Sequence, residues 1–233
     1  MEKIIINNIE IELTKKNIKN LHLSVHPPDG RVKISAPQYM DTDTIRLFAI
    51  SKLSWIRKQQ KKFINQERQP EREYVSGESH YFLGQRYLLN VIYTNKRKQG
   101  VEIRNKKYID LYVRENTPKY LRERAMTEWY RRELKKLIPT IIAKLEPIMG
   151  VEVNEFGVKK MKTRWGSCNP KAKRIWLNLE LVKKSPTCIE YVVVHEMTHL
   201  LERKHNERLI AYMDKFLPNW RAIKAELNGL IYE

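Results

Sequence analysis

Alternating apolar and polar residues dominate the first half of the chain and predict strands. Residues Ile4–Ile6 and Ile9–Leu13 flank Asn7-Asn8, a pair that tolerates the positive φ angles of a tight hairpin turn. The same alternation recurs over Leu21–Ala36, where Pro27–Gly30 supplies a turn. The chain therefore begins with two predicted β pairs.

Two further β ribbons are expected over residues 81–92 and 101–113, and one helix separates them from the first two pairs. The helix is predicted over Thr44–Asn65, because apolar side chains recur there at helical spacing. Either Asp41 or Asp43 can cap its start. The sequence gives no indication of an internal repeat.

Helical periodicity takes over at Thr117-Pro118, which form a cap and first-turn pair. A long helix is expected from there to Met149, where Gly150 stops it. We place a domain boundary at the start of this helix. Residues 1–116 then form a β-rich amino-terminal region with one helix, and residues 117–233 form the second domain, so the predicted fold class is α+β.

A hairpin and a further helix are predicted later in the second half. Residues Val158–Trp165 and Ile175–Leu179 flank a turn at Asn169–Lys171. Either Ser185-Pro186 or Thr187 then starts a helix. This last helix contains the residues with the clearest chemistry.

The helix carries His-Glu-Met-Thr-His at residues 195–199. A spacing of four residues turns a helix by roughly 400°, so His195 and His199 lie on one face and can share one metal ion. Glu196 points about 100° away from His195, beside the metal's open position, where it can take a proton from a bound water. The alternative, in which these histidines only pack on an amphipathic helix, explains the spacing less well.

A third histidine, His205, stands six residues after His199. On an uninterrupted helix it would point roughly 120° away and lie about 9 Å further along the axis, so the helix must end or turn between Leu200 and His205. Metzincin-type sites share this spacing but have Gly three residues after the second histidine, where this chain has Glu202. Three neutral imidazoles plus water would make an open, roughly tetrahedral site for one Zn²⁺ per chain.

Composition bears on partners and location. The chain of 233 residues has only two cysteines and no stretch typical of a signal peptide, so a cytoplasmic location is expected. Its apolar runs are too short to cross a membrane. The net charge of +18 would attract nucleic acid, although Lys and Arg are spread along the chain and a generally basic, solvated surface is the alternative. Nothing in the sequence indicates an oligomeric state.

Two motifs resemble those of the YgjP-like metallopeptidase family. They are Arg-Trp-Gly-Ser-Cys at residues 164–168 and Val-Val-His-Glu-x-x-His at residues 193–199. The likeness extends through His205, the aromatic stretch Phe216–Trp220 and the β-rich first half, so it covers most of the chain.

This resemblance implies a zincin-like α+β core with an active-site helix. It also implies that His195, His199 and His205 hold zinc and that Glu196 is the catalytic base. The core of the family is similar to that of SprT-like proteins, which act near DNA, so the resemblance leaves a role near nucleic acid open.

In zincin architectures an extended substrate pairs with an edge strand beside the metal helix, and the hairpin Met161–Leu179 is the candidate for that edge. Trp165 and Trp176 either line the cleft or pack in the core, and Gly166 would allow close approach of the backbone. Candidates for stabilising the tetrahedral oxyanion are Arg164, Tyr191 and Tyr212.

Other polar residues admit two interpretations. Cys168 is either a zinc ligand that blocks the open position or a small buried residue, whereas Cys188 is expected to pack. Glu207 either contacts the metal or one of its ligands, or is a solvated carboxylate. The remaining histidines are expected at surface or turn positions: His22, His26 and His80.

The leading hypothesis is a zinc metallopeptidase that hydrolyses peptides or unfolded proteins by Glu-assisted attack of water. The alternative is a nucleic-acid-associated zinc protein, either a protease acting on DNA-bound protein or a non-catalytic binding module. A third hypothesis, a metal protein without turnover, is disfavoured by Glu196, since losing that base is the simplest way to disable such a site.

Overall fold

The computed structural model shows an α+β protein with a β-rich amino-terminal half, which confirms the predicted fold class. It describes residues 2–26, 29–64, 72–95 and 100–229, with the backbone alone for residues 62–64. Two parts of the predicted elements, Pro27-Pro28 and Asn65, lie outside the described residues. The chain divides into two compact units, Met1–Pro70 and Glu71–Glu233, and each has its own hydrophobic core.

The first unit contains a four-stranded sheet. Its strands are β1 (Glu2–Ile6), β2 (Ile9–Lys16), β3 (His22–His26) and β4 (Arg31–Pro37). They lie in the order β1-β2-β4-β3, with β2 and β4 parallel and the two outer pairs antiparallel. The predicted turn at Asn7-Asn8 is confirmed by φ angles of 44° and 63°.

Two helices follow this sheet where the sequence predicted one. They are α1 (Thr42–Ser51) and α2 (Leu53–Ile64), and they are separated at Lys52. Apolar periodicity continues across Lys52, which explains why the sequence alone did not separate the two helices. Of the two predicted caps, Asp41 is the one in place, because its side chain accepts a hydrogen bond of 2.7 Å from the Thr44 backbone N–H.

The second unit begins with a sheet of the same topology. Its strands are β5 (Ser79–Phe82), β6 (Gln85–Tyr93), β7 (Gly100–Arg104) and β8 (Tyr108–Val113). The order is β5-β6-β8-β7, with β6 and β8 parallel and the outer pairs antiparallel. Leu83-Gly84 joins β5 to β6 with φ angles of 49° and 80°, as Asn7-Asn8 joins β1 to β2. The structure thus contains a topological repeat that the sequence did not reveal.

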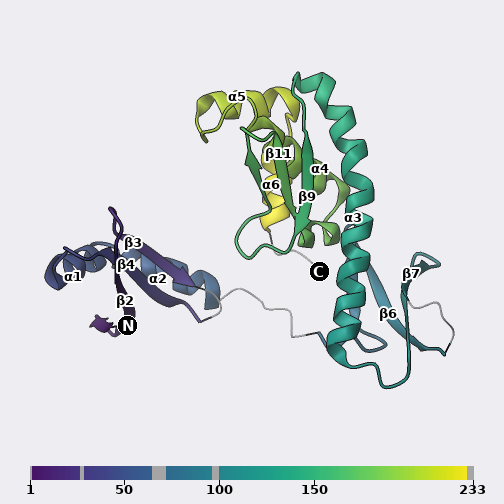
Figure 1. Ribbon diagram of the computed structural model, residues 1–233, viewed down its shortest axis with the longest axis horizontal. Helices are drawn as coiled ribbons and strands as arrows, with labels where there is room; N and C mark the ends of the chain where they lie inside the picture. Colours follow the sequence, from purple (N-terminus) through teal and green to yellow (C-terminus); the bar gives the residue numbers. More distant parts are fainter. Residues whose placement is uncertain (1, 27–28, 65–71, 96–99, 230–233) are drawn as a thin grey trace. The chain divides into compact units, whose positions relative to one another are not determined.

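The long helix α3 (Lys119–Met149) runs past this sheet and on to the remaining elements of the unit (Figure 1). Gly150 ends it with a left-handed φ of 66°, as predicted. The elements that follow are β9 (Glu155–Lys159), β10 (Gly166–Asn169), β11 (Arg174–Asn178), the 3₁₀ helix η1 (Leu179–Lys183), α4 (Pro186–Thr198), α5 (Glu207–Phe216) and α6 (Trp220–Asn228). None of the described helices combines the length and hydropathy that a membrane span requires.

The structure divides the chain earlier than the boundary predicted at Thr117-Pro118. Helix α3 packs on the strands that precede it, and its buried Trp129 lies with its ring centroid 5.0 Å from that of Phe82 on β5. One hydrophobic core extends from Phe82 to Leu227. The change from β to α periodicity near Thr117 marks a change of element within one unit.

The hairpin near the metal motif is shorter than predicted. Strand β10 pairs antiparallel with β11, but Val158 belongs to β9, which pairs with β11 in parallel. The sheet order β10-β11-β9 makes β10 an edge strand. Residues 160–165 form a loop between β9 and β10, because the run from Lys159 to Lys162 has no apolar alternation with which to continue a strand.

His80 lies buried in β5 and not at the surface position expected for it. Its Nε2 is 3.2 Å from Oε2 of Glu78, and burial lowers its pKa from the ordinary 6.5 to about 4. The unfolded chain therefore takes up a proton below about pH 6.5 that the folded chain does not.

We expect the free energy of unfolding to fall as the pH drops from 6.5 towards 4, by at most about 3 kcal/mol from this group. Denaturant titrations at several pH values will measure this slope. His80→Gln should flatten the slope, whereas His22→Gln, at an exposed histidine, should leave it unchanged. An equal slope in wild type and His80→Gln would contradict the assignment.

Candidate active site

Helix α4 supplies the metal motif and is held in the core of the second unit. Ser185 caps it by accepting a hydrogen bond of 3.3 Å from the Cys188 backbone N–H, so the first of the two predicted starts is the observed one. Its apolar run Val192–Val194 is buried, and Cys188 is buried as expected. The helix therefore offers its polar carboxyl-terminal end to solvent from a rigid base.

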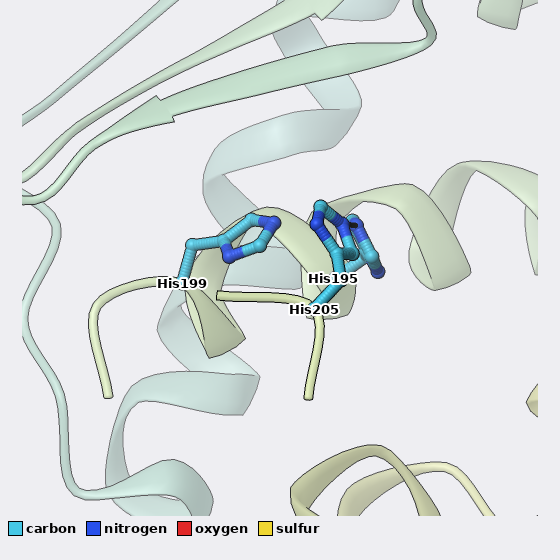
Figure 2. A group of neighbouring side chains, drawn as sticks. All are labelled: His195, His199 and His205. Atoms are coloured by element: carbon cyan, nitrogen blue, oxygen red, sulfur yellow. Dashed lines mark hydrogen bonds between the residues drawn. The ribbon is translucent and has the colours of Figure 1, made fainter. Parts of the chain in front are cut away.

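The three predicted ligands come together at that end. Figure 2 shows the rings of His195, His199 and His205 facing one another. Their possible ligand atoms all lie within 4.8 Å of one another, and Nε2 of His195 is 3.2 Å from Nε2 of His205. Two nitrogens bound to one tetrahedral zinc at 2.0–2.1 Å would lie about 3.3 Å apart, so the spacing suits a shared ion.

The turn that brings His205 back needs no glycine. Helix α4 ends at Thr198, and the backbone N–H groups of Leu201 and Glu202 each bond the Thr198 carbonyl oxygen at 3.0 Å. Among the described residues with positive φ, none lies between His199 and His205. Glu202 can therefore stand where metzincin-type sites have glycine, and the predicted change of direction before His205 is confirmed.

The electrostatics of the cluster favour neutral imidazoles. Burial, followed by the neighbouring His199 and His205, lowers the pKa of His195 to about 4. Burial also lowers the pKa of His199, whose Nδ1 lies 3.1 Å from the Glu202 carbonyl oxygen. Because a carbonyl oxygen can only accept, Nδ1 carries the proton and Nε2 keeps its lone pair for a metal.

Glu196 is buried beside the triad and packs against strand β10. A Cβ atom added at Gly166 would lie 2.6 Å from Oε1 and 2.7 Å from Cγ of Glu196, so only glycine fits there. The close approach predicted for Gly166 is thus made to the Glu196 side chain. Burial raises the pKa of the Glu196 carboxyl to about 8, while the positive charge of Arg164 opposes part of this rise.

The loop before β10 is fastened by Asn178, a buried residue at the end of β11. Its Nδ2 donates to the carbonyl oxygens of Met161 at 3.1 Å and Arg164 at 2.8 Å. Its Oδ1 accepts from the backbone N–H groups of Met161 and Glu180, and its own N–H donates to the Trp165 carbonyl at 2.8 Å. Asn178 therefore fixes the loop that carries Arg164 and Trp165.

A cleft of 1110 Å³ surrounds the triad and Glu196. Three of the predicted contact residues line it, namely Arg164, Trp165 and Tyr191. Tyr212 does not line it, and its ring stacks on Phe216 with centroids 5.9 Å apart. The structure thus gives no support to a role for Tyr212 at the metal.

A model of one protein family covers nearly the whole chain. It is described as "YgjP-like, metallopeptidase domain" and matches residues 19–230. The chain belongs to the YgjP-like family. The resemblance inferred from its two motifs is therefore confirmed, and the protein is a metallopeptidase.

Two solved structures of metallopeptidase zymogens are similar to part of this YgjP-like chain. Abylysin of Pyrococcus abyssi shares 16% identity over 40% of this chain and 90% of its own, with a TM-score of 0.35. Jannalysin of Methanocaldococcus jannaschii shares 19% identity over 39% of this chain and 92% of its own, also with a TM-score of 0.35. No curated protein sequence matches the chain.

Trp165 and Trp176 differ in position in this YgjP-like protein. Trp165 both packs against the core and lines the cleft, and its Nε1 donates to Oδ1 of Asn228 at 3.3 Å. Trp176 does not line the cleft. Its ring lies over Gly157, where an added Cβ would come within 2.3 Å of it. Of the two tryptophans, Trp165 alone lines the cleft.

Neither Cys168 nor Glu207 belongs to the histidine group. Cys168 lines the cleft, but among the described residues the group that can hold a metal contains only the three histidines. Burial raises the pKa of the Cys168 thiol to about 11, which disfavours the thiolate that binds metals. Glu207 lies exposed in the first turn of α5 and is also outside that group. The positions of Cys168 and Glu207 both fit the alternatives in which these residues do not bind the metal.

Helix α6 forms a wall of the cleft that the sequence did not predict. Lys224, Leu227 and Asn228 line the cleft from α6, and Arg203 lines it from the turn after α4. The amphipathic spacing of Ile223 and Leu227, both buried, is the signal that could have located this helix. No sequence signal would have placed it beside the metal motif.

Proposed function

We propose that this metallopeptidase depends on zinc, with His195, His199 and His205 as its ligands and Glu196 as the general base. The observation that carries the proposal is the convergence of three imidazoles beside a buried carboxylate in one cleft. Three imidazoles with an open fourth position are typical of catalytic zinc, and one ion per chain is expected.

Zinc bound there would supply Lewis acid chemistry, which activates a water molecule and polarises the scissile carbonyl group. Glu196 would accept a proton from the attacking water on its carboxylate as the water oxygen bonds to the carbonyl carbon. It would then pass that proton to the amide nitrogen as the carbon–nitrogen bond breaks, releasing a carboxylate and an amine. The wall formed by Gly166 holds the carboxylate in place for both transfers.

Arg164 is the best-placed group for stabilising the oxyanion. It lines the cleft, its charge acts on Glu196, and Asn178 fixes its backbone. Tyr191 also lines the cleft and is the alternative, with its ring centroid 6.0 Å from that of His195. A charged donor aimed at a developing negative charge contributes most, which favours Arg164.

Strand β10 is the candidate for backbone recognition of the substrate. It is the edge strand of its sheet, and Gly166, Ser167, Cys168 and Asn169 all line the cleft. An extended peptide that adds to this edge would gain main-chain hydrogen bonds whatever its side chains. The proposed substrates are accordingly peptides and unfolded proteins.

Elemental analysis of purified protein tests the metal assignment. We expect about one zinc per chain in the wild type, much less zinc in His199→Ala, which removes a ligand, and an unchanged zinc content in His22→Ala, at an exposed histidine outside the site. Cleavage of an unfolded protein should follow the zinc content. Wild-type protein that holds no zinc, or that cleaves equally well after zinc is removed by a chelator, would contradict the proposal.

A further inference from the structure

The cleft around the triad is more basic than the chain as a whole. Of the described residues that line it, only Glu196 is acidic, whereas four are cationic: Arg164, Lys171, Arg203 and Lys224. The whole chain has 45 Lys and Arg against 27 Asp and Glu, a ratio below two to one. The excess of positive charge in the cleft is therefore not simply the average of a basic protein.

Within the described part of the chain, none of these four cations forms an ion pair. Cations nearby on the β10–β11 hairpin but outside the cleft are paired, since Lys173 lies 2.9 Å from Glu152 and Arg174 lies 2.5 Å from Glu155. The two hairpin cations that lie outside the cleft are thus paired with carboxylates. In the cleft, the Arg164 charge acts on Glu196 and Nζ of Lys224 lies 5.5 Å from the centroid of the Trp220 ring, but no described carboxylate pairs with any of the four cations.

The cations lie at both ends of the proposed recognition strand. Arg164 precedes β10 by two residues and Lys171 follows it by two, and the four residues of β10 span about 13 Å. From residue 156 to residue 179 the chain has seven Lys and Arg and no Asp or Glu. Lys224 adds a positive charge from α6, where it lines the same cleft as the triad. An extended peptide on β10 would have positive charge at both of its ends.

We infer that the cleft selects acidic peptides, with Asp or Glu side chains on both sides of the scissile bond. This inference rests on the proposed function and adds a substrate class to it. Carboxylates form strong charge-assisted hydrogen bonds with Lys and Arg, whereas basic substrates are repelled. A nucleic acid would share the attraction but cannot make the strand-edge hydrogen bonds that β10 offers, so the observations favour a peptide.

Two fluorescence-quenched peptides test the inference. They are identical except that one has Glu and the other has Gln at the positions flanking the scissile bond. We expect kcat/KM to be about tenfold higher for the Glu peptide at low salt, since each solvent-exposed pair contributes up to roughly fivefold. The ratio should fall towards one at 0.5 M salt, because salt screens exposed charges.

Charge reversal in the cleft provides the matched variants. Lys171→Glu should lower the Glu-to-Gln ratio by about fivefold or more. Lys160→Glu makes the same change in charge at an exposed residue of the preceding loop that does not line the cleft, and it should leave the ratio unchanged. Equal effects of the two substitutions would show that overall charge, and not the cleft, sets the preference.

Binding to the Glu196→Gln variant separates this inference from the proposed function. Fluorescence anisotropy measures the affinity of both peptides for that variant without turnover. A Glu-to-Gln affinity ratio near one overturns the inference, even if both peptides are cleaved. A high ratio with no cleavage by the zinc-loaded wild type keeps the inference and overturns the peptidase mechanism. If the variant bound both peptides equally well and a single-stranded oligonucleotide displaced both of them, the cleft would be assigned to nucleic acid.

Discussion

Replacing Glu196 with glutamine is expected to lower kcat/KM for peptide cleavage by about 10² to 10⁴-fold while the protein keeps its zinc. Glutamine has the size of glutamate and fits the space beside Gly166, but it cannot accept a proton from water near neutral pH. The three ligands are untouched, because Glu196 is outside the histidine group. Peptide cleavage and elemental analysis of the same sample measure the two properties together.

Glu190→Gln is the matched control for this substitution. Glu190 lies on the same helix, α4, outside the cleft, and its carboxylate is 2.8 Å from Nζ of Lys144. An exposed pair of this kind contributes little, so activity should stay within about twofold of the wild type. If Glu196→Gln kept most of its activity, another group would have to be the base. If it lost zinc, Glu196 would have a structural role in the metal site.

Replacing Gly166 with alanine should reduce kcat/KM by about 10²-fold with zinc retained, since displacing a catalytic group by about 1 Å can cost that much. The added methyl group would lie within 2.6 to 2.9 Å of three atoms of the Glu196 side chain, so the carboxylate must move. Because the clash is with Glu196 and not with a histidine, the effect should appear in kcat more than in metal content. Steady-state kinetics with zinc-loaded protein will show whether the loss lies in kcat and not in metal content.

Gly100→Ala controls for the substitution of glycine in a strand. Among the described residues, no atom lies within 4 Å of a Cβ added at Gly100, the first residue of β7. The double variant Gly166→Ala, Glu196→Gln gives a further check. If Gly166 acts through Glu196, the double variant should be no slower than Glu196→Gln alone. Additive losses would place the role of Gly166 elsewhere, for example in the edge of β10 that meets the substrate.

The parts of the site that follow from local geometry could be predicted from the sequence. The four-residue spacing of His195 and His199 defines a shared helix face, and the distance to His205 requires the helix to end, which it does at Thr198. Hairpins with turn residues suited to positive φ were also predictable, as at Asn7-Asn8. In each case the determining residues lie within one element or one turn.

What could not be predicted depends on contacts between distant segments. The parallel pairing of β9 with β11 has no turn signature, so the sequence placed Val158 in the wrong partner strand. The packing of α3 on the β5–β8 sheet removed the predicted domain boundary, although the local change of periodicity was real. Asn178 has no distinguishing pattern in a strand sequence, and its function in holding the loop appears only from its hydrogen bonds.

The histidine triad and the walls of the cleft depend on different parts of the chain, and this difference has a practical consequence for work with this protein. The three proposed ligands occupy one helix end and the turn after it, between positions 195 and 205. The walls of the cleft depend on β10, on the loop held by Asn178 and on α6. We therefore expect a molecule in which α6 or that loop is displaced still to bind zinc. Metal content and active fraction are separate properties of a preparation, and an active-site titration is needed to count the working molecules.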